Sequence, residues 1–450
     1  MDFTTGSVPK QMLAFALPHM LTSALQVAYS AVDLAIVGQA VSGAALAAVS
    51  TSSHVLNLLT MLGLGFSTGG QVYMAQALGI RKREMTANII TSMVTAMIAV
   101  SVILAAITAV FSSRIVMLLN TPWESVTMAI EYLSIGSIGV IFTFIYNGLA
   151  AVMRAHGNSK TPLFAILLSS LVNIILDIVF VIFLKMAVVG AIVATVLGQL
   201  IAALILLFKI LGNQDLYGVR FAKNLWKPDI KMITAICKLS VPYALEMTVF
   251  NISMLFVNSM VNHVDLMASE TFGIGLKVEE IGNKLCTGVT CATSVMTAQS
   301  VASGNIARTR KIVHTAWIFG GSMYFVFAVT CFCFSRQLFA IFVDDVAVID
   351  NAPMFIHALS YGFPAMASMR ATNGLIQGVS NANLSLIIGV LDGIVVRIPL
   401  AYILGVVFDM QLWGFFLAYA LAAYTNAVLG LCYYLSKRWE KRELAVERNR

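Results

Sequence analysis

Charged residues are scarce in this sequence: they make up 11% of its 450 residues, whereas hydrophobic residues make up 59%. A soluble globular domain carries about 25% charged residues, so the composition excludes an ordinary soluble fold. The apolar runs are long and continuous, and they lack the polar–apolar alternation that marks transmembrane β-strands. Because a segment inside a bilayer must satisfy its own backbone hydrogen bonds, the sequence predicts an all-α polytopic membrane protein.

Motifs that carry chemistry are equally scarce. The six cysteines form no C-x-x-C pair and lie in apolar stretches, so we interpret them as buried small hydrophobic residues. No histidine pair has metal-ligand spacing, and the phosphate-binding loop G-x-x-x-x-G-K-[ST] does not occur. These absences argue against an ATP-driven pump, against an enzyme and against a bound cofactor.

The positive charge of the chain is concentrated in alternate loops. Lysine and arginine cluster at 81–83, 154–160, 209–231, 308–311 and 437–450, whereas the loops between these clusters hold only Arg114, Lys185 and Arg336. Such alternation favours a topology signal over ordinary solvated loop charge, and it argues against nucleic-acid binding. By the positive-inside rule, both termini lie in the cytoplasm and the number of spans is even.

Twelve apolar segments are long enough to cross a bilayer as helices, since about 20 residues span the hydrocarbon core. They cover residues 10–38, 46–78, 86–111, 123–153, 160–184, 188–211, 231–261, 267–302, 308–334, 346–378, 383–408 and 412–437. The predicted organisation is an N-terminal six-helix lobe at 1–211, a cytoplasmic connecting loop at 212–229, a C-terminal six-helix lobe at 230–437 and a basic cytoplasmic tail at 438–450.

The two predicted lobes resemble each other at a spacing of 223 or 224 residues. The matching pairs are Leu17-Pro18 with Val241-Pro242, Asn158 with Asn381, and Val189-Gly190 with Trp413-Gly414. Six spans return the chain to its starting side, so the repeat is parallel, and transporters of this design bind substrate between halves that rock. Pro18 and Pro242 lie within predicted helices and bend them, either as static kinks or as hinges.

One acid stands alone in the fifth span. Asp177 is the only charged residue in the run 163–184, and Asn173 lies one helical turn before it on the same face. An ionised carboxylate on an isolated helix in lipid costs at least about 2.5 kcal/mol, so it must face protein or a water-filled cavity. The pair is a candidate functional site; the alternative is a buried aspartate that serves helix packing through backbone or hydroxyl donors.

A second acid, Asp33, lies near the end of the first span, with Tyr29 one turn before it. At a rise of about 1.5 Å per residue, Asp33 and Asp177 both fall in the outer half of the bilayer, and Thr195 in the sixth span reaches a similar depth. We expect these three residues to converge with Asn173. Two carboxylates, an amide and a hydroxyl suit a small cation such as Na⁺, and neighbouring carboxylates also suit a proton carrier.

Other polar residues are secondary candidates for substrate contacts or for a polar network. Tyr29 is one of them, and Asn147 in the fourth span lies deeper, nearer the cytoplasm. Glu246 lies four residues after Pro242, near the cytoplasmic end of the seventh span, where it serves either as a substrate contact or as an interfacial acid.

The eighth and eleventh spans also carry charge. Lys277, Glu280 and Lys284 are spaced three and four residues apart, so they form one stripe on a helix. We favour a self-neutralised polar stripe, with Glu280 in a substrate network as the alternative. Asp392 and Arg397 are expected to compensate each other's charge within the bundle.

These residues, taken in order, make the sequence resemble the multidrug and toxic compound extrusion (MATE) family, and within it the DinF-like prokaryotic branch. The resemblance covers nearly the whole chain, from Pro18 to about Lys437. Each motif is short, and their order and spacing carry the match: Val32-Asp33, Ala75-Gln76-Ala77-Leu78-Gly79, Arg154-Ala155-His156-Gly157-Asn158, Asn173-Ile174-Ile175-Leu176-Asp177, Arg397-Ile398-Pro399-Leu400-Ala401 and Trp413-Gly414.

The resemblance implies two six-helix lobes in a V shape and a monomeric secondary transporter in a prokaryotic inner membrane. It also implies export of amphipathic, often cationic, drugs or metabolites in exchange for H⁺ or Na⁺ by alternating access. The coupling residues of the family carry over to Asp33, Asn173, Asp177 and Thr195, where Na⁺ is a candidate ligand. The second half departs from the family pattern, because residues 277–284 are more charged and lack a proline; no second cation site is therefore carried over.

Two other hypotheses compete with the antiporter. A flippase for lipid-linked intermediates belongs to the same superfamily, and the set Asp33, Asn173 and Asp177 argues against it because the set looks like a coupling site. A membrane-embedded enzyme is the other hypothesis, and the near-symmetric halves and the missing nucleophile motifs argue against it. An antiporter dissipates an ion gradient when substrate is added, whereas an enzyme turns over its substrate without any gradient.

Overall fold

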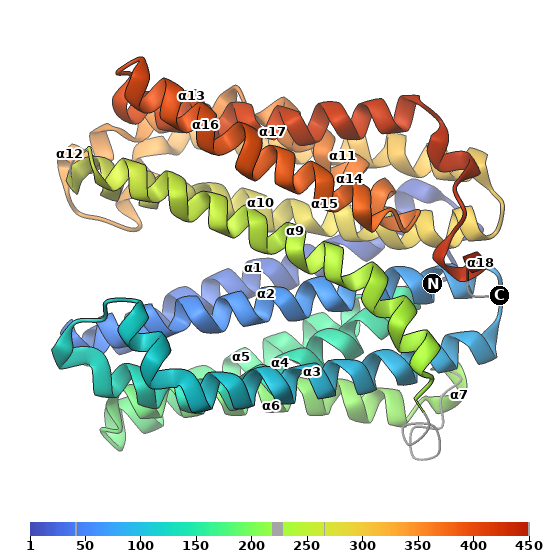
Figure 1. Cartoon of the computed structure of the whole chain (residues 1–450), viewed down its shortest axis with the longest axis horizontal. Helices are drawn as coiled ribbons and strands as arrows, with labels where there is room; N and C mark the ends of the chain where they lie inside the picture. Colours follow the sequence, from blue (N-terminus) through green and yellow to red (C-terminus); the bar gives the residue numbers. More distant parts are fainter. Residues whose placement is uncertain (41–42, 218–227, 265, 449–450) are drawn as a thin grey trace. The chain divides into compact units, whose positions relative to one another are not determined.

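The computed structural model describes residues 1–40, 43–217, 228–264 and 266–448, without the side chains of residues 27–40, 83 and 266. Within these ranges every regular element is a helix, and Figure 1 shows the helices of each half as long rods that lie side by side. Nine helices in these ranges, 24 to 37 residues long, are apolar enough to cross a membrane.

The first half of the chain contains six spanning segments. They are α1 (Val8–Ala40), α2 (Gly43–Gly79), α3 (Arg83–Leu118), α4 (Val126–Ala155), α5 (Lys160–Asp177) and α6 (Ala187–Leu211). A 3-10 turn, η1 (Trp123–Ser125), precedes α4, and a π-helix, η2 (Ile178–Phe183), continues α5. The short α7 (Gln214–Tyr217) belongs to the predicted connecting loop, whose residues 218–227 lie outside the described residues.

The second half again contains six spanning segments. The first three are α9 (Ile230–Asn262), α10 (Leu266–Ala302) and α11 (Ile306–Ala340). The fourth consists of two helices, α13 (Ala352–Ser360) and α14 (Phe363–Gly378), and the fifth of four consecutive elements, α15 (Ala382–Val390), η3 (Leu391–Arg397), α16 (Ile398–Tyr402) and η4 (Ile403–Val407). The sixth is α17 (Gln411–Leu435). The short α12 (Val346–Asp350) precedes α13. The chain is thus an all-α polytopic membrane protein, as predicted, with twelve spanning segments.

The tenth span is broken, so the prediction of one continuous helix over 346–378 is wrong. The helix stops at Asp350 and again at Ser360. Pro353 and Pro364 lie in the first turns of α13 and α14. Proline is tolerated in the first turn of a helix, whereas inside a helix it removes a backbone hydrogen bond and its ring clashes with the preceding turn, so these positions favour a break.

The two halves repeat one another in structure. Helices α1 and α9 have 33 residues each, α2 and α10 have 37 each, and α6 and α17 have 25 each. Left-handed backbone angles recur at matching positions: Lys185 and Asp409, 224 residues apart, have φ of 53° and 52°. The predicted pseudo-symmetry is therefore confirmed down to the turns that join the spans.

The described chain divides into two compact units, and each unit takes a segment from the other half of the sequence. Unit 1 contains Met1 and Leu21–Ala244, and unit 2 contains Asp2–Met20 and Leu245–Arg448. The first part of α9 therefore packs inside unit 1, and the first part of α1 packs inside unit 2. In unit 1, α4 packs on α2, α3 and α6; in unit 2, α14 packs on α10, α11 and α17.

Small residues permit this exchange of segments. A side chain at Gly69 of α2 would lie 2.7 Å from the Cα atom of Ser240 in the first part of α9. The Ser240 hydroxyl instead donates a hydrogen bond to the carbonyl oxygen of Phe66 at 2.9 Å. In unit 2, a side chain at Gly288 of α10 would strike the carbonyl oxygen of Ala16 in α1 at 2.7 Å. Close helix contact through small residues is the usual packing mode in membranes.

The cysteines only partly follow their prediction. None of the six, all of which lie in the described ranges, forms a disulfide; Cys286 and Cys331 are buried, whereas Cys333 and Cys432 are exposed. The prediction of buried cysteines is wrong for the last two, because an apolar position on a spanning helix can face lipid as well as protein.

The N-terminal residues are anchored inside unit 2. The Phe3 side chain is fully buried and packs edge-on against Phe15, and its N–H donates to Gln299 Oε1 at 3.1 Å. The Arg308 guanidinium donates four hydrogen bonds of 2.7 to 2.8 Å to this segment, to the carbonyl oxygens of Phe3, Thr5 and Gly6 and to Gln11 Oε1. One arginine thus supplies partners for carbonyl groups that no helix satisfies.

The C-terminal residues also fold back onto unit 2. A 3-10 turn, η5 (Arg438–Lys441), follows α17, and α18 (Ala445–Arg448) follows η5. Trp439 is fully buried, and its indole N–H donates to the carbonyl oxygen of Tyr434 at 3.0 Å. The segment predicted as a basic tail is therefore packed against the bundle over its described length.

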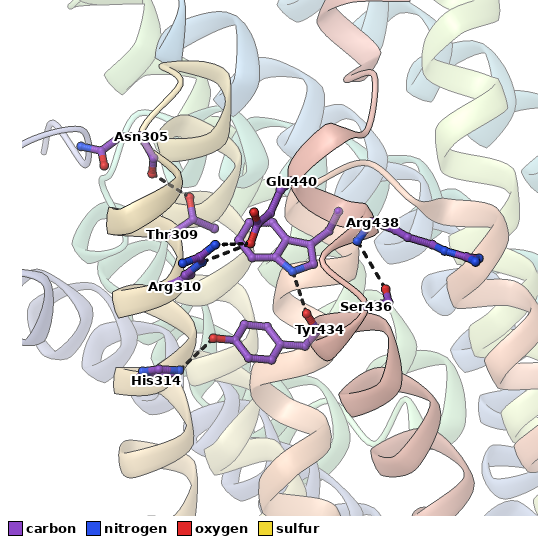
Figure 2. A network of polar contacts seen from close by, with 9 residues as sticks. Asn305, Thr309, Arg310, His314, Tyr434, Ser436, Arg438 and Glu440 are labelled. Carbon is purple, nitrogen blue, oxygen red and sulfur yellow. Dashed lines mark hydrogen bonds and ion pairs between the residues drawn. The ribbon is translucent and has the colours of Figure 1, made fainter.

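Two side-chain contacts join this segment and the end of α17 to the start of α11 (Figure 2). Arg310 pairs with Glu440 at 2.7 Å, and the Tyr434 hydroxyl hydrogen-bonds to His314 Nε2 at 2.8 Å. The Arg310–Glu440 pair is partly exposed, so it contributes little stability by itself. The buried indole ring anchors the segment, and the ion pair fixes its register on α11.

Replacement of Arg308 by alanine tests the N-terminal anchor. Hydrogen bonds to a charged donor contribute about 1.5–3 kcal/mol, and each 1.4 kcal/mol of local stability is about a tenfold change in opening. We expect the backbone amides of residues 3–11 to exchange hydrogen at least about tenfold faster in Arg308→Ala. Arg310→Ala, which removes the nearby arginine that does not touch this segment, is the control; equal exchange in both variants would contradict the anchor.

Candidate functional site

Helix α5 places its polar residues on one buried face. The buried positions recur about once per helical turn: Pro162, the adjacent pair Ala165 and Ile166, Ser169, Asn173 and Asp177. Leu167, Leu171 and Ile175 alternate with them and are about half exposed, at 48% to 54%. This helical periodicity turns the apolar stripe toward lipid and the polar stripe toward protein.

Asn173 and Asp177 are both shielded from the surroundings. Asp177 is 0% exposed and Asn173 is 2% exposed. Neither amide atom of Asn173 has a hydrogen-bond partner among the described residues, which leaves a buried oxygen and a buried amino group available to a ligand. The π-helix η2 begins directly after Asp177, and such local changes of helix pitch are frequent at functional sites.

Helix α6 meets α5 at Asn173. A Cβ atom on Gly198 would lie 3.1 Å from the Cβ atom of Asn173 and 3.4 Å from the carbonyl oxygen of Ser169. Because α5 and α6 are antiparallel, Asp177 lies one turn beyond this contact, at the level of Thr195. The Thr195 hydroxyl donates to the carbonyl oxygen four residues earlier at 3.0 Å, so its lone pairs stay available as acceptors.

The other predicted members of this site are placed less fully. Tyr29 and Asp33 belong to α1, but their side chains lie outside the described residues. Convergence of Asp33 with Asp177 therefore stays a prediction. Asn147 is buried on α4, eight residues before the helix ends, whereas Asn173 lies 13 residues into α5. Asn147 is therefore roughly 8 Å closer to the α4–α5 connection than Asn173.

The possible chemistry where α5 and α6 meet follows from the ligand atoms of Asn173, Asp177 and Thr195. A carboxylate, an amide oxygen and a hydroxyl are hard oxygen ligands of the kind that small hard cations prefer. A buried carboxylate can also take up a proton, which removes the cost of holding a charge away from water. The unpartnered amide of Asn173 fits either ligand, because its oxygen accepts from a proton carrier or binds a cation directly.

The secondary candidates of the second half lie in unit 2 and differ from each other. Glu246 on α9 accepts a hydrogen bond of 2.5 Å from the Ser385 hydroxyl on α15. Glu280 on α10 is exposed and pairs with Lys284 at 3.7 Å, while Lys277 Nζ lies 5.7 Å from the centre of an aromatic ring. Glu280 thus belongs to a surface stripe, whereas Glu246 is held between two spans.

A cluster of buried charges in unit 2 is larger than the sequence indicated. Arg397 and Asp392 form an ion pair at 2.8 Å and are 3% and 5% exposed, so the expected charge compensation is confirmed. Arg370 on α14 is also buried, and it donates to Asn283 Oδ1 at 2.6 Å and to the Tyr324 hydroxyl at 3.1 Å. The contacts of Arg370 thus join three different spans, α10, α11 and α14.

Glu279 completes the cluster and was missed as a site residue. Its carboxylate is buried and interacts with Tyr419 and with the guanidinium groups of Arg370 and Arg397. The signal in the sequence was the presence of acids and arginines within predicted spans, among them Glu279, Arg370, Asp392 and Arg397. Sequence spacing relates residues within one helix only, so the partners across α10, α14, η3 and α17 were not readable.

The fold and these buried polar residues define a multi-pass membrane protein built from two copies of a six-helix repeat. A family model described as MatE matches residues 18–179 and again residues 242–403, so its two matches begin 224 residues apart. The chain therefore belongs to the MatE family. Members of this family are membrane transporters of small molecules, and the chain is a transporter and not an enzyme.

Known relatives cover almost the whole chain at modest identity. The chain is 26% identical over 447 residues to the probable multidrug resistance protein YpnP of Bacillus subtilis, covering 99% of each sequence. It is 26% identical to the probable multidrug resistance protein NorM of Thermotoga maritima, covering 97% of this chain and 94% of the relative. A solved multidrug resistance MATE family transporter in an outward-facing conformation aligns with a TM-score of 0.92 at 20% identity over 98% of both chains.

Replacement of Gly198 by valine tests the contact between α5 and α6. The added side chain would meet Asn173 and Ser169, and forcing extra atoms into packed helices costs about 1–3 kcal/mol. We expect a lower melting temperature for Gly198→Val in detergent micelles. Gly321→Val is the matched control, because a Cβ atom on Gly321 meets no atom within 4 Å. If Gly198→Val had the same melting temperature as the wild type, α5 and α6 would not be in contact at Asn173.

Proposed function

We propose that this chain is a secondary active efflux transporter that exports amphipathic, often cationic, drugs or metabolites in exchange for H⁺ or Na⁺ by alternating access. The names of its relatives support the substrate class, since YpnP and NorM are described as probable multidrug resistance proteins. The two structural repeats support alternating access, because repeated bundles are the usual basis of such movement.

The observation that carries the proposal is the buried pair on α5. Asp177 is fully buried in a helix with exposed apolar residues on its other face, and Asn173 keeps a buried amide without a partner among the described residues. Ionisable residues inside a membrane are costly, and they mark ion or proton pathways by default. In the proposed mechanism, Asp177 binds the coupling ion, with Asn173 and Thr195 as oxygen ligands and Asp33 as the second carboxylate.

Uptake and release of that ion drive transport by shifting a conformational equilibrium. A ligand shifts two states only by its different affinity for each, so the coupling ion and the substrate must prefer different states. Protonation or Na⁺ binding at Asp177 removes the buried negative charge, and this changes which packing of α5 and α6 has the lower free energy. The chain works as a monomer in the bilayer in this proposal.

The proposed setting is a prokaryotic inner membrane with both termini in the cytoplasm. The supporting observation is the alternation of basic loops, since lysine and arginine accumulate on the cytoplasmic side of spanning segments. The described helix ends fit this orientation, because the basic cluster 81–83 joins α2 to α3 and the cluster 308–311 opens α11.

Substitution of Asp177 by asparagine separates a coupling role from a structural one. The change removes the charge and keeps the shape, so we expect gradient-driven efflux of a fluorescent cationic dye from proteoliposomes to be abolished. The purified variant should stay folded, and any effect of Na⁺ or pH on its melting temperature should disappear, because a bound ligand raises the melting temperature only of a state that binds it. Asp33→Asn should act in the same direction, more weakly.

Asp350→Asn is the control for this substitution. Asp350 forms an exposed ion pair with Arg336 at 3.2 Å, and its loss should leave efflux and the Na⁺ response unchanged. If Asp177 served packing alone, Asp177→Asn would lower stability by about 1–3 kcal/mol while transport per folded molecule stayed normal. Efflux at the wild-type rate by Asp177→Asn would contradict a coupling role for Asp177.

Cysteine labelling tests the proposed orientation. In a chain whose native cysteines are replaced by serine, single cysteines are placed at the exposed positions Lys82, Ser303 and Asp409. A membrane-impermeant maleimide added to intact cells should leave the first two unlabelled and label the third. Labelling of all three from the same side would reject the twelve-span topology.

A further inference from the structure

The guanidinium group of Arg397 fills a cage in unit 2. Its central carbon lies 4.4 Å from the ring centre of Phe250 and 5.2 Å from that of Tyr419. One terminal nitrogen donates to Asp392 Oδ2 at 2.8 Å, and the other contacts Met254 Sδ at 3.1 Å. Aromatic faces, a soft sulfur and a carboxylate are the groups that recognise organic cations in proteins.

A π-helical turn builds this cage. Asp392 and Arg397 are five residues apart, a spacing that puts residues on different faces of an α-helix but on the same face of a π-helix. Both lie in η3, which spans Leu391–Arg397. Pro399 follows at the start of α16 and lacks the N–H that an α-helix would use, which accounts for the change of pitch here.

Helix α9 closes the cage from the side. A Cβ atom on Gly393 would lie 3.2 Å from the Ser253 hydroxyl and 3.3 Å from a methyl group of Val249. The absence of that atom lets α9 approach η3 closely. Phe250 and Met254 lie next to these two residues, one turn apart, so α9 presents both of them to Arg397.

The cage is charge-balanced but not fully satisfied. The buried charges in the described part of unit 2, Glu279 and Asp392 against Arg370 and Arg397, are equal in number. A further cation therefore adds an uncompensated buried charge unless it replaces one that is present. Asp392 Oδ1 and Arg397 Nε are both buried without a hydrogen-bond partner among the described residues. An incoming cation can therefore bind to Asp392 Oδ1 before Arg397 is displaced. Arg397 loses few hydrogen bonds when it leaves, because its Nε has no partner among the described residues.

We propose that Arg397 is a tethered cation that occupies an organic-cation site formed by Phe250, Tyr419 and Asp392, and that a guanidinium or ammonium group of a transported compound competes with it for that site. Arg397 sets specificity here: it excludes weakly held cations and admits those that bind the cage better than its own side chain does. The inference takes its physiological meaning from the proposed export of cationic compounds, whereas the cage itself is testable by binding alone.

The experiment removes the tethered cation and supplies a free one. Purified Arg397→Ala is titrated with ethylguanidinium at millimolar concentrations, far below denaturing levels, and with ethylurea as its neutral analogue. We expect Arg397→Ala to melt at a lower temperature than the wild type and to regain much of the difference with ethylguanidinium but not with ethylurea. We also expect it to bind ethylguanidinium at least about tenfold more tightly than the wild type, which already holds a guanidinium in the site.

Matched variants locate the effect. Arg397→Ala combined with Asp392→Asn should lose the rescue, because the carboxylate that anchors the cation is gone. Arg370→Ala removes the other buried arginine of the cluster, which donates to Asn283 and Tyr324 outside this cage, and ethylguanidinium should not rescue it. Absence of binding to Arg397→Ala, equal rescue of Arg370→Ala, or equal rescue by ethylurea would each overturn the proposal.

A variant that fails to fold still decides the question. Arg397→Met keeps an unbranched apolar stem but has no guanidinium group, and it is purified with and without 5 mM ethylguanidinium, a concentration of about that order being enough for a millimolar site. Recovery of folded protein only with the cation supports the cage, and equal failure in both preparations rejects it. Because these readouts need no transport, they stand apart from the outcome of Asp177→Asn, which tests the proposed efflux.

Discussion

A polar group inside a bilayer has only the protein for a partner, and this constraint shapes every level of the molecule. It makes helices the spanning elements, since each backbone group must be satisfied within its own segment. It turns Asn173 and Asp177 of α5 to the protein side while leucine and isoleucine on the same helix meet lipid.

The two units meet this constraint in different ways. Unit 2 pairs its buried acids with buried arginines across several spans, which yields a cluster without net charge. On the described part of α5 in unit 1, a buried acid stands beside an amide whose oxygen and nitrogen have no partner. A neutralised cluster responds little to ions, whereas an acid beside an open amide has room for one. The two units thus share one repeat but differ in their buried polar residues. This difference motivates a coupling role for the polar residues of unit 1 and a specificity role for those of unit 2.

Much of this arrangement could be predicted from the sequence, and the remainder could not for identifiable reasons. Apolar run lengths and basic loops predicted the spans, because both features depend on residues near each other along the chain. The 224-residue spacing predicted the repeat, because a repeat shows as similar residues at a constant offset in the sequence. Pro353 and Pro364 indicated the helix breaks before α13 and α14, but the continuous hydrophobicity of residues 346–378 led to the prediction of one helix. The pairing of Asp392 with Arg397 was expected, yet its geometry depends on a π-helical turn, and the positions of Phe250 and Tyr419 around it depend on contacts between spans. The same limit hid the burial of Trp439, which sits in a basic segment and looked like part of a solvated tail.

The exchange of segments between the units has a consequence for how the chain is made. Unit 2 includes residues 2–20, which are synthesised before almost all of unit 1, yet most of the other residues of unit 2 are not synthesised until after position 245. Unit 1 cannot close until the start of α9 emerges, after the entire connecting loop. Neither of the two six-helix halves of the sequence therefore forms a complete unit by itself, and the first part of α1 reaches the membrane before its partners in unit 2 are synthesised. Folding of both units is in this way coupled to synthesis of the second half.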